Sequence, residues 1–138
     1  MNDGILLLGR ILMASLFLPS GIGKLFDFAP FAASLAAKGM PFPEAFASVA
    51  VLIEVLGPIA LILGAFPRST AWVMIAFVIM ATATSHRFWE FDAEARRMQQ
   101  INFFKNVGII AGFLFYSVSG AGSWSWIVWP RTSRPETA

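Results

Sequence analysis

The chain has 138 residues, of which 57% are hydrophobic and only 13% charged, with a formal net charge of +2. The charged share is about half of that in soluble proteins, which excludes a water-soluble globule. No cluster of lysine and arginine could hold a phosphate backbone, so nucleic acid is excluded as a partner, and the absence of cysteine excludes thiolate chemistry within this chain.

Four apolar segments are long enough to cross a bilayer core of about 30 Å as helices. We expect these spans at about residues 5–25, 43–64, 69–85 and 101–120. The first should be a retained span, because Pro19, Gly21 and Lys24 stand where a signal peptide would have its cleavage site. Residues 65–68 alone separate the second and third spans, which predicts an antiparallel helical hairpin.

Two of the connections also predict structure. Between the first two spans, a short helix over residues 30–38 should lie flat at the membrane interface, with Phe31 and Leu35 toward lipid. Before the fourth span, Asp92 can cap a helix that continues into that span. The fourth helix should then protrude from the membrane.

These elements predict an all-α fold, a polytopic membrane four-helix bundle with a short interfacial helix between the first two spans. It forms a single domain over residues 1–130, followed by a short, polar and disordered tail over 131–138. Aromatic residues beyond the span ends suit the two belts of a membrane protein. They are Phe88, Trp89, Phe91, Trp124, Trp126 and Trp129.

Arg10 and Glu54 lie within apolar spans, where an ionisable side chain costs roughly 2.5–3.5 kcal/mol. Helical spacing places Gly21 and Lys24 on the same face as Arg10. Small residues beside charges favour close helix contact inside a bundle. We therefore expect Arg10 to face Glu54 in a dry interior, either to line a ligand or proton path or only to fix the helix register.

The fourth span should complete this interior. Lys105, Gly108 and Gly112 share a stripe with a G-x-x-x-G spacing, and we expect that stripe to help enclose Glu54. Pro58 removes the N–H that would otherwise bond to the Glu54 carbonyl, so this level of the second span should be polar.

Further polar side chains lie near the loop end of the spans, and His86 is the only histidine among them. A single histidine excludes bis-histidine haem and argues against a zinc site, so neither haem nor metal is expected. Less specific interpretations remain open, since Lys24 and Lys105 can reach the membrane surface and His86 can pair with Trp89 there. The group consists of Lys24, His86, Gln99, Gln100, Lys105 and Asn106.

Several motifs follow one another along nearly the whole chain. They are Arg10, SGIGKL (20–25), GMPFP (39–43), IEVLG (53–57), HRFW (86–89) and FKN (104–106). In this order and spacing they resemble the DoxX family of small four-helix membrane proteins. The resemblance implies an inner (plasma) membrane component linked to redox metabolism, since relatives include subunits of thiosulfate-quinone oxidoreductase. It marks as the family's polar positions Arg10, Lys24, Glu54, His86, Lys105 and Asn106.

Three functions fit these residues. The first is a membrane subunit of a redox system that binds a quinone or similar apolar ligand inside the bundle, through the six polar positions and with Glu54 as candidate proton carrier. The second is a non-catalytic scaffold for a peripheral oxidoreductase, and the third is a small anion or metabolite carrier. The lipid bilayer is the expected environment, and a peripheral oxidoreductase or a second copy is the candidate protein partner. The sequence assigns no catalytic residue.

Overall fold

The computed structural model describes residues 2–126 as helices and connecting loops, with no strand in that part of the chain. The elements are α1 (Asp3–Phe26), α2 (Phe28–Ala37), α3 (Pro43–Leu63), α4 (Pro67–Ser85), a 3-10 turn η1 (Phe88–Glu90) and α5 (Ala93–Ser119). Within residues 2–126, α1, α3, α4 and α5 are long and apolar enough to cross a membrane. The predicted all-α, four-span architecture with a short helix after the first span is therefore confirmed. Trp129 and the tail over 131–138 lie outside the described residues.

A capping residue sets where α5 begins. The Asp92 carboxylate accepts a hydrogen bond from the Ala95 N–H at 3.0 Å, as an N-cap does. This cap starts α5 well before the apolar segment at residue 101. The 27 residues of α5 extend about 40 Å at 1.5 Å each. Because the bilayer core is about 30 Å thick, α5 is longer than a span requires, as predicted.

The α3–α4 hairpin follows from its four connecting residues. Gly64 ends α3 with a φ of 68°, a left-handed conformation that glycine adopts at low cost. The N–H of Gly64 bonds to the Leu61 carbonyl and that of Ala65 to the Ala60 carbonyl, which closes the helix end. Pro67 then occupies the first turn of α4, where its missing N–H costs nothing.

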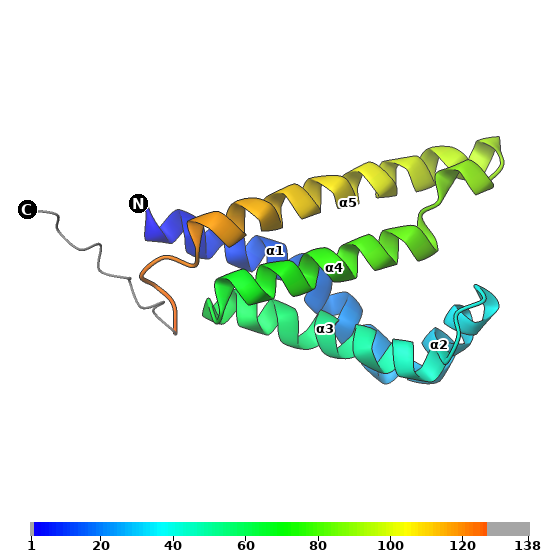
Figure 1. The fold of residues 1–138 in the computed structure, drawn as a ribbon, viewed down its shortest axis with the longest axis horizontal. Coiled ribbons are helices and arrows are strands. Elements are labelled where there is room, and N and C mark those ends of the chain that lie inside the picture. Colours follow the sequence, from blue (N-terminus) through cyan, green and yellow to red (C-terminus); the bar gives the residue numbers. More distant parts are fainter. Residues whose placement is uncertain (1, 127–138) are drawn as a thin grey trace, which may run out of the picture.

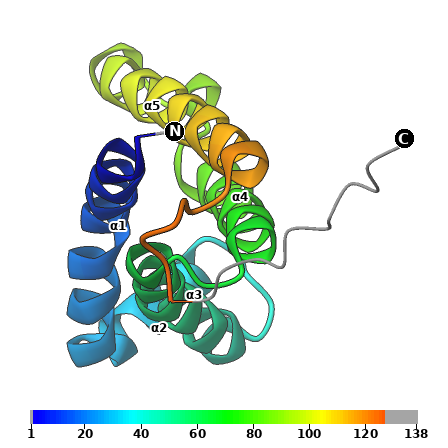
Figure 2. The same ribbon diagram turned by 90° about the vertical axis from the view of Figure 1, so that its left-hand side faces the viewer.

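The helices lie in the spatial order α1, α3, α4 and α5 (Figures 1 and 2). In Figure 1, α3 and α4 diverge from their hairpin toward the end of the molecule where α2 lies. The N-terminus of α1 and the segment after α5 lie together at the opposite end, where the Ser123 N–H bonds to Asp3 Oδ1 at 3.0 Å. The two ends of the described chain therefore lie on the same side of the bundle, as four spans require.

The core lies where all four long helices meet. Phe17 of α1 packs against Phe113 of α5 with ring centroids 5.9 Å apart, and both belong to a buried cluster that also contains Leu61 of α3 and Met74 of α4. Many large apolar side chains on the outer faces stay exposed, as expected for helices surrounded by lipid.

The orientation predicted for the short helix is wrong. Leu35 is buried and packs with Ala32 against Ala47 near the start of α3, and Phe31 packs partly buried on the same cluster. The reason is that residues 38–42 turn back sharply, so α2 lies against α3 and directs these side chains inward.

Candidate functional site

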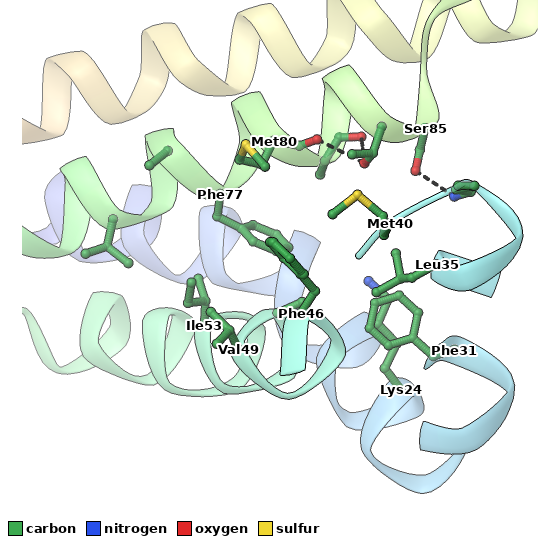
Figure 3. Close-up of a pocket in the computed structure, with 16 residues that line it drawn as sticks. Lys24, Phe31, Leu35, Met40, Phe46, Val49, Ile53, Phe77, Met80 and Ser85 are labelled. Carbon is green, nitrogen blue, oxygen red and sulfur yellow. Dashed lines mark hydrogen bonds between the residues drawn. The ribbon is translucent and has the colours of Figure 1, made fainter. Parts of the chain in front are cut away.

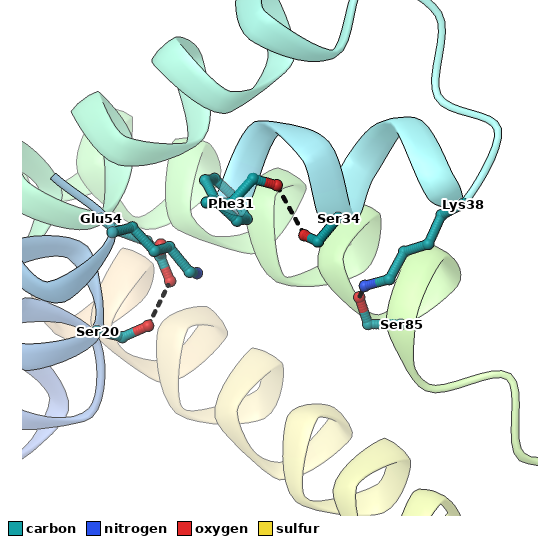
Figure 4. Close-up of polar contacts among 7 residues, drawn as sticks. Ser20, Phe31, Ser34, Lys38, Glu54 and Ser85 are labelled. Carbon is teal, nitrogen blue, oxygen red and sulfur yellow. Dashed lines mark hydrogen bonds and ion pairs between the residues drawn. The ribbon is translucent and has the colours of Figure 1, made fainter. Parts of the chain in front are cut away.

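Glu54 forms an ion pair with Lys24 in the interior of the bundle. The Lys24 Nζ lies 2.5 Å from Glu54 Oε2, and the Ser20 hydroxyl donates to Glu54 Oε1 at 3.4 Å (Figure 4). The Glu54 side chain is only 6% exposed, whereas that of Lys24 is 30% exposed. Lys24 also lies over the Phe31 ring, 4.8 Å from its centroid. Its ammonium thus contacts groups from α2 and α3 at once.

Gly21 explains how the pair forms. A Cβ built on Gly21 would lie 2.7 Å from the Glu54 carbonyl oxygen, so only glycine lets the two backbones come this close. Ser20 and Lys24 are four residues apart, before and after Gly21, so their side chains lie on adjacent turns of α1. Both side chains therefore reach Glu54 on α3. The carbonyl that Gly21 faces is the one deprived of its helical donor by Pro58, which is itself buried within α3.

The predicted contact between Arg10 and Glu54 is wrong. Arg10 is 2% exposed, but its guanidinium donates to the carbonyls of Ile62, at 3.1 Å, and Trp124, at 2.5 Å. Gly21 lies at the level of Glu54, and Arg10 lies eleven residues, or about 16 Å, before Gly21 on α1. Because α1 and α3 are antiparallel, this displacement places Arg10 nearer the end of α3. It therefore meets the end of α3, where unpaired carbonyls and the helix dipole stabilise a cation.

Arg10 is thus part of a polar cluster that closes the terminal end of the bundle. Asp3 accepts hydrogen bonds from the N–H and the hydroxyl of Ser123, and the Trp126 N–H donates to the Leu63 carbonyl at 2.8 Å. These contacts fasten the segment after α5 to α1 and α3. Of the two roles considered for Arg10, this geometry matches the structural one.

Two of the other predicted site residues, His86 and Asn106, connect α5 with α4 and the residue that follows it. His86 Nδ1 lies 2.8 Å from Gln99 Oε1, and Asn106 donates to the Thr82 hydroxyl at 2.9 Å. Lys105 is exposed and donates to Asn102 at 3.1 Å. None of these three contacts involves Lys24 or Glu54.

The predicted enclosure of Glu54 by the fourth span is also wrong. A Cβ added to Gly108 would meet nothing within 4 Å, and α5 packs mainly on α4. Of these two glycines, Gly112 alone approaches α1, where an added Cβ would lie 3.4 Å from Met13. The reason is that α4 stands between α3 and most of α5. Of the six predicted site residues, the structure brings together Lys24 and Glu54.

A pocket of about 360 Å³ lies beside this ion pair, between α2, α3 and α4 (Figure 3). Its wall is mostly apolar and includes an aromatic side chain from each of the three helices, together with two methionine side chains. The Lys24 side chain forms one part of the wall, whereas Lys38, Thr84 and Ser85 line another. Sequence analysis missed this pocket, because it requires α2 to lie against α3. Its apolar residues include Phe31, Leu35, Met40, Phe46, Phe77 and Met80.

Comparison with known proteins gives two curated relatives, both from Escherichia coli. The inner membrane protein YphA is 32% identical over 119 residues, which cover 86% of this chain and 85% of YphA. The inner membrane protein YqjF is 29% identical over 125 residues, which cover 91% of each chain. No solved structure matches significantly. Together with the four apolar helices, these relatives confirm the predicted inner-membrane location.

A family model provides the assignment. The DoxX model matches residues 5–87, which include the Lys24–Glu54 pair, α1 from residue 5 onward and all of α2 to α4, and it ends before α5. The matched part therefore contains the pocket and every helix that lines it. This integral membrane protein belongs to the DoxX family.

Proposed function

We propose that this protein is a membrane subunit of a redox system and binds a quinone or a similar apolar ligand in the pocket between α2, α3 and α4. The observation that carries the proposal is the pocket itself, an apolar cavity of about 360 Å³ with an ammonium group in its wall. Small-molecule sites typically have about 300–1,000 Å³, mostly apolar walls and few polar groups. A substituted quinone ring has matching chemistry, since its faces are apolar and its carbonyls accept hydrogen bonds.

Lys24 is the group that would orient such a ring. An ammonium has three N–H donors, of which one is directed at Glu54 in the structure. The remaining donors can serve a carbonyl oxygen in the pocket. Phe31 of α2 and Phe77 of α4 line the pocket from different helices and offer aromatic faces to the ring.

Glu54 would then be the proton carrier behind the ligand. Reduction of a quinone to a quinol takes up two electrons and two protons. We assign the electrons to a partner oxidoreductase, because this chain has no cysteine for a thiol or disulfide redox step. Lys24, whose ammonium lines the pocket, would give each of the two protons to a ring oxygen. Water at the membrane surface would return each proton to Lys24 by way of the Glu54 carboxylate, which contacts the ammonium.

A second candidate function is a scaffold that holds a peripheral oxidoreductase at the membrane. The start of α5, before the apolar segment at residue 101, favours this alternative, because Glu94, Arg96 and Arg97 are exposed there. The two functions are compatible, since a partner docked at α5 could deliver electrons to a bound quinone. A pure scaffold would bind no ligand in the pocket.

Filling the pocket tests the proposal. Ala81→Phe places a ring in the pocket from α4, whereas Ala83→Phe, two residues later, points to an exposed face that does not line it. We expect the purified wild type and Ala83→Phe to bind decylubiquinone saturably, and Ala81→Phe to bind it roughly tenfold or more weakly because its ring occupies the site. Equilibrium titration in detergent measures this. Equal affinity of both variants, or no saturable binding by the wild type, would contradict the proposal.

A further inference from the structure

The charged groups along the pocket are unbalanced. Lys24, in the last turn of α1, and Lys38, directly after α2, both line it. No aspartate or glutamate among residues 2–126 lines the pocket. Along the chain, Lys24 precedes α2 and Lys38 follows it, so the two lysines lie at different ends of this helix, and Figure 4 shows Lys38 at its C-terminal end.

The two lysines differ in what compensates their charge. Lys24 is paired with the Glu54 carboxylate, whereas Lys38 donates to the Ser85 hydroxyl at 2.8 Å, which is a neutral partner. Two ammonium groups and one carboxylate leave the site with a net charge of +1. The excess positive charge lies at Lys38, on the side of the pocket that Ser85 closes from the end of α4.

We propose that the pocket selects apolar ring compounds with a negatively charged oxygen, such as the anion of a hydroxyquinone, and that Lys38 recognises this oxygen. The inference rests on the proposed function, because it uses the same pocket and specifies its ligand class. An ammonium forms stronger hydrogen bonds with an anionic oxygen than with a neutral one. Its three donors let Lys38 keep Ser85 while it binds the ligand.

The test uses two ligands that differ in charge but little in shape. 2-Hydroxy-3-methyl-1,4-naphthoquinone is an anion at neutral pH, and its 2-methoxy ether is neutral. Both are titrated into wild type, Lys38→Gln and Lys38→Arg in nanodiscs of phosphatidylcholine, which adds no anionic lipid. Because Lys38 is exposed, its substitution should leave the fold intact.

We expect the wild type and Lys38→Arg to bind the anion about fivefold more tightly than the ether, a modest factor because Lys38 is exposed to solvent. Lys38→Gln should bind both ligands with similar affinity, because the preference for the anion is lost. Equal binding of both ligands by the wild type, or a preference that survives in Lys38→Gln, would overturn the inference while leaving the proposed function intact. Failure of both ligands to bind would overturn the proposed function as well.

Discussion

Replacement of Lys24 by methionine is expected to destabilise the protein by about 3–5 kcal/mol, because the substitution leaves the Glu54 carboxylate buried without its cation. The Glu54 side chain is only 6% exposed, and its other polar contact is a 3.4 Å hydrogen bond from Ser20. Methionine keeps most of the apolar part of the lysine side chain, so the loss of stability reflects the removal of the ammonium charge. The free energy of unfolding in mixed micelles measures it.

Two variants serve as controls for this result. Lys105→Met removes an exposed lysine from α5 and should change stability by at most about 0.5 kcal/mol. Lys24→Met combined with Glu54→Gln removes both charges and should recover much of the lost stability. If Lys24→Met proved as stable as Lys105→Met, the ion pair would not hold α1 against α3.

A methyl group added at Gly21 is expected to lower stability by about 1–3 kcal/mol, because it would push α1 away from α3. The added Cβ would lie 2.7 Å from the Glu54 carbonyl oxygen and 2.8 Å from the carbonyl carbon. These are backbone atoms of a helix and cannot move aside alone. The thermal unfolding temperature of Gly21→Ala in detergent measures the effect.

Gly23 provides a matched control in the same helix. A Cβ at Gly23 would meet nothing within 4 Å, so alanine there should raise stability by up to about 1 kcal/mol through its higher helix propensity. The two alanine variants should therefore shift the unfolding temperature in opposite directions. Shifts of the same sign and size would show that the backbones do not approach each other at Gly21.

The fold was largely predictable from the sequence, for physical reasons. The length of each apolar segment follows from the thickness of the bilayer, and Asp92 and Pro67 carry local signals that mark where helices start. These signals act within one or two turns of the chain. They do not determine which faces of distant helices meet, and for that reason the orientation of α2 was predicted wrongly.

The candidate site was predictable only in part. Sequence analysis found Glu54 as a buried carboxylate but chose Arg10 as its partner, because both lie inside spans. The register between α1 and α3 decides the partner, and this register depends on the close approach at Gly21. Lys24 lies three residues from Gly21 on the same face, whereas Arg10 lies eleven residues away. Pairing the small residue of α1 with the buried charge of α3 therefore favours Lys24. The pocket depends on three helices at once and has no local signal.

The most direct test of the ligand site is photolabelling with an azido-quinone in membranes that contain the protein, followed by mapping of the labelled peptides. The account predicts labels within residues 31–40 and 76–85, two segments that contain residues lining the pocket, and their loss when excess unlabelled quinone competes. Labels confined to the exposed side of α5, for example at Phe104 and Phe115, would contradict it, because those residues face away from the pocket toward lipid. Labelling that excess quinone does not reduce would contradict it equally.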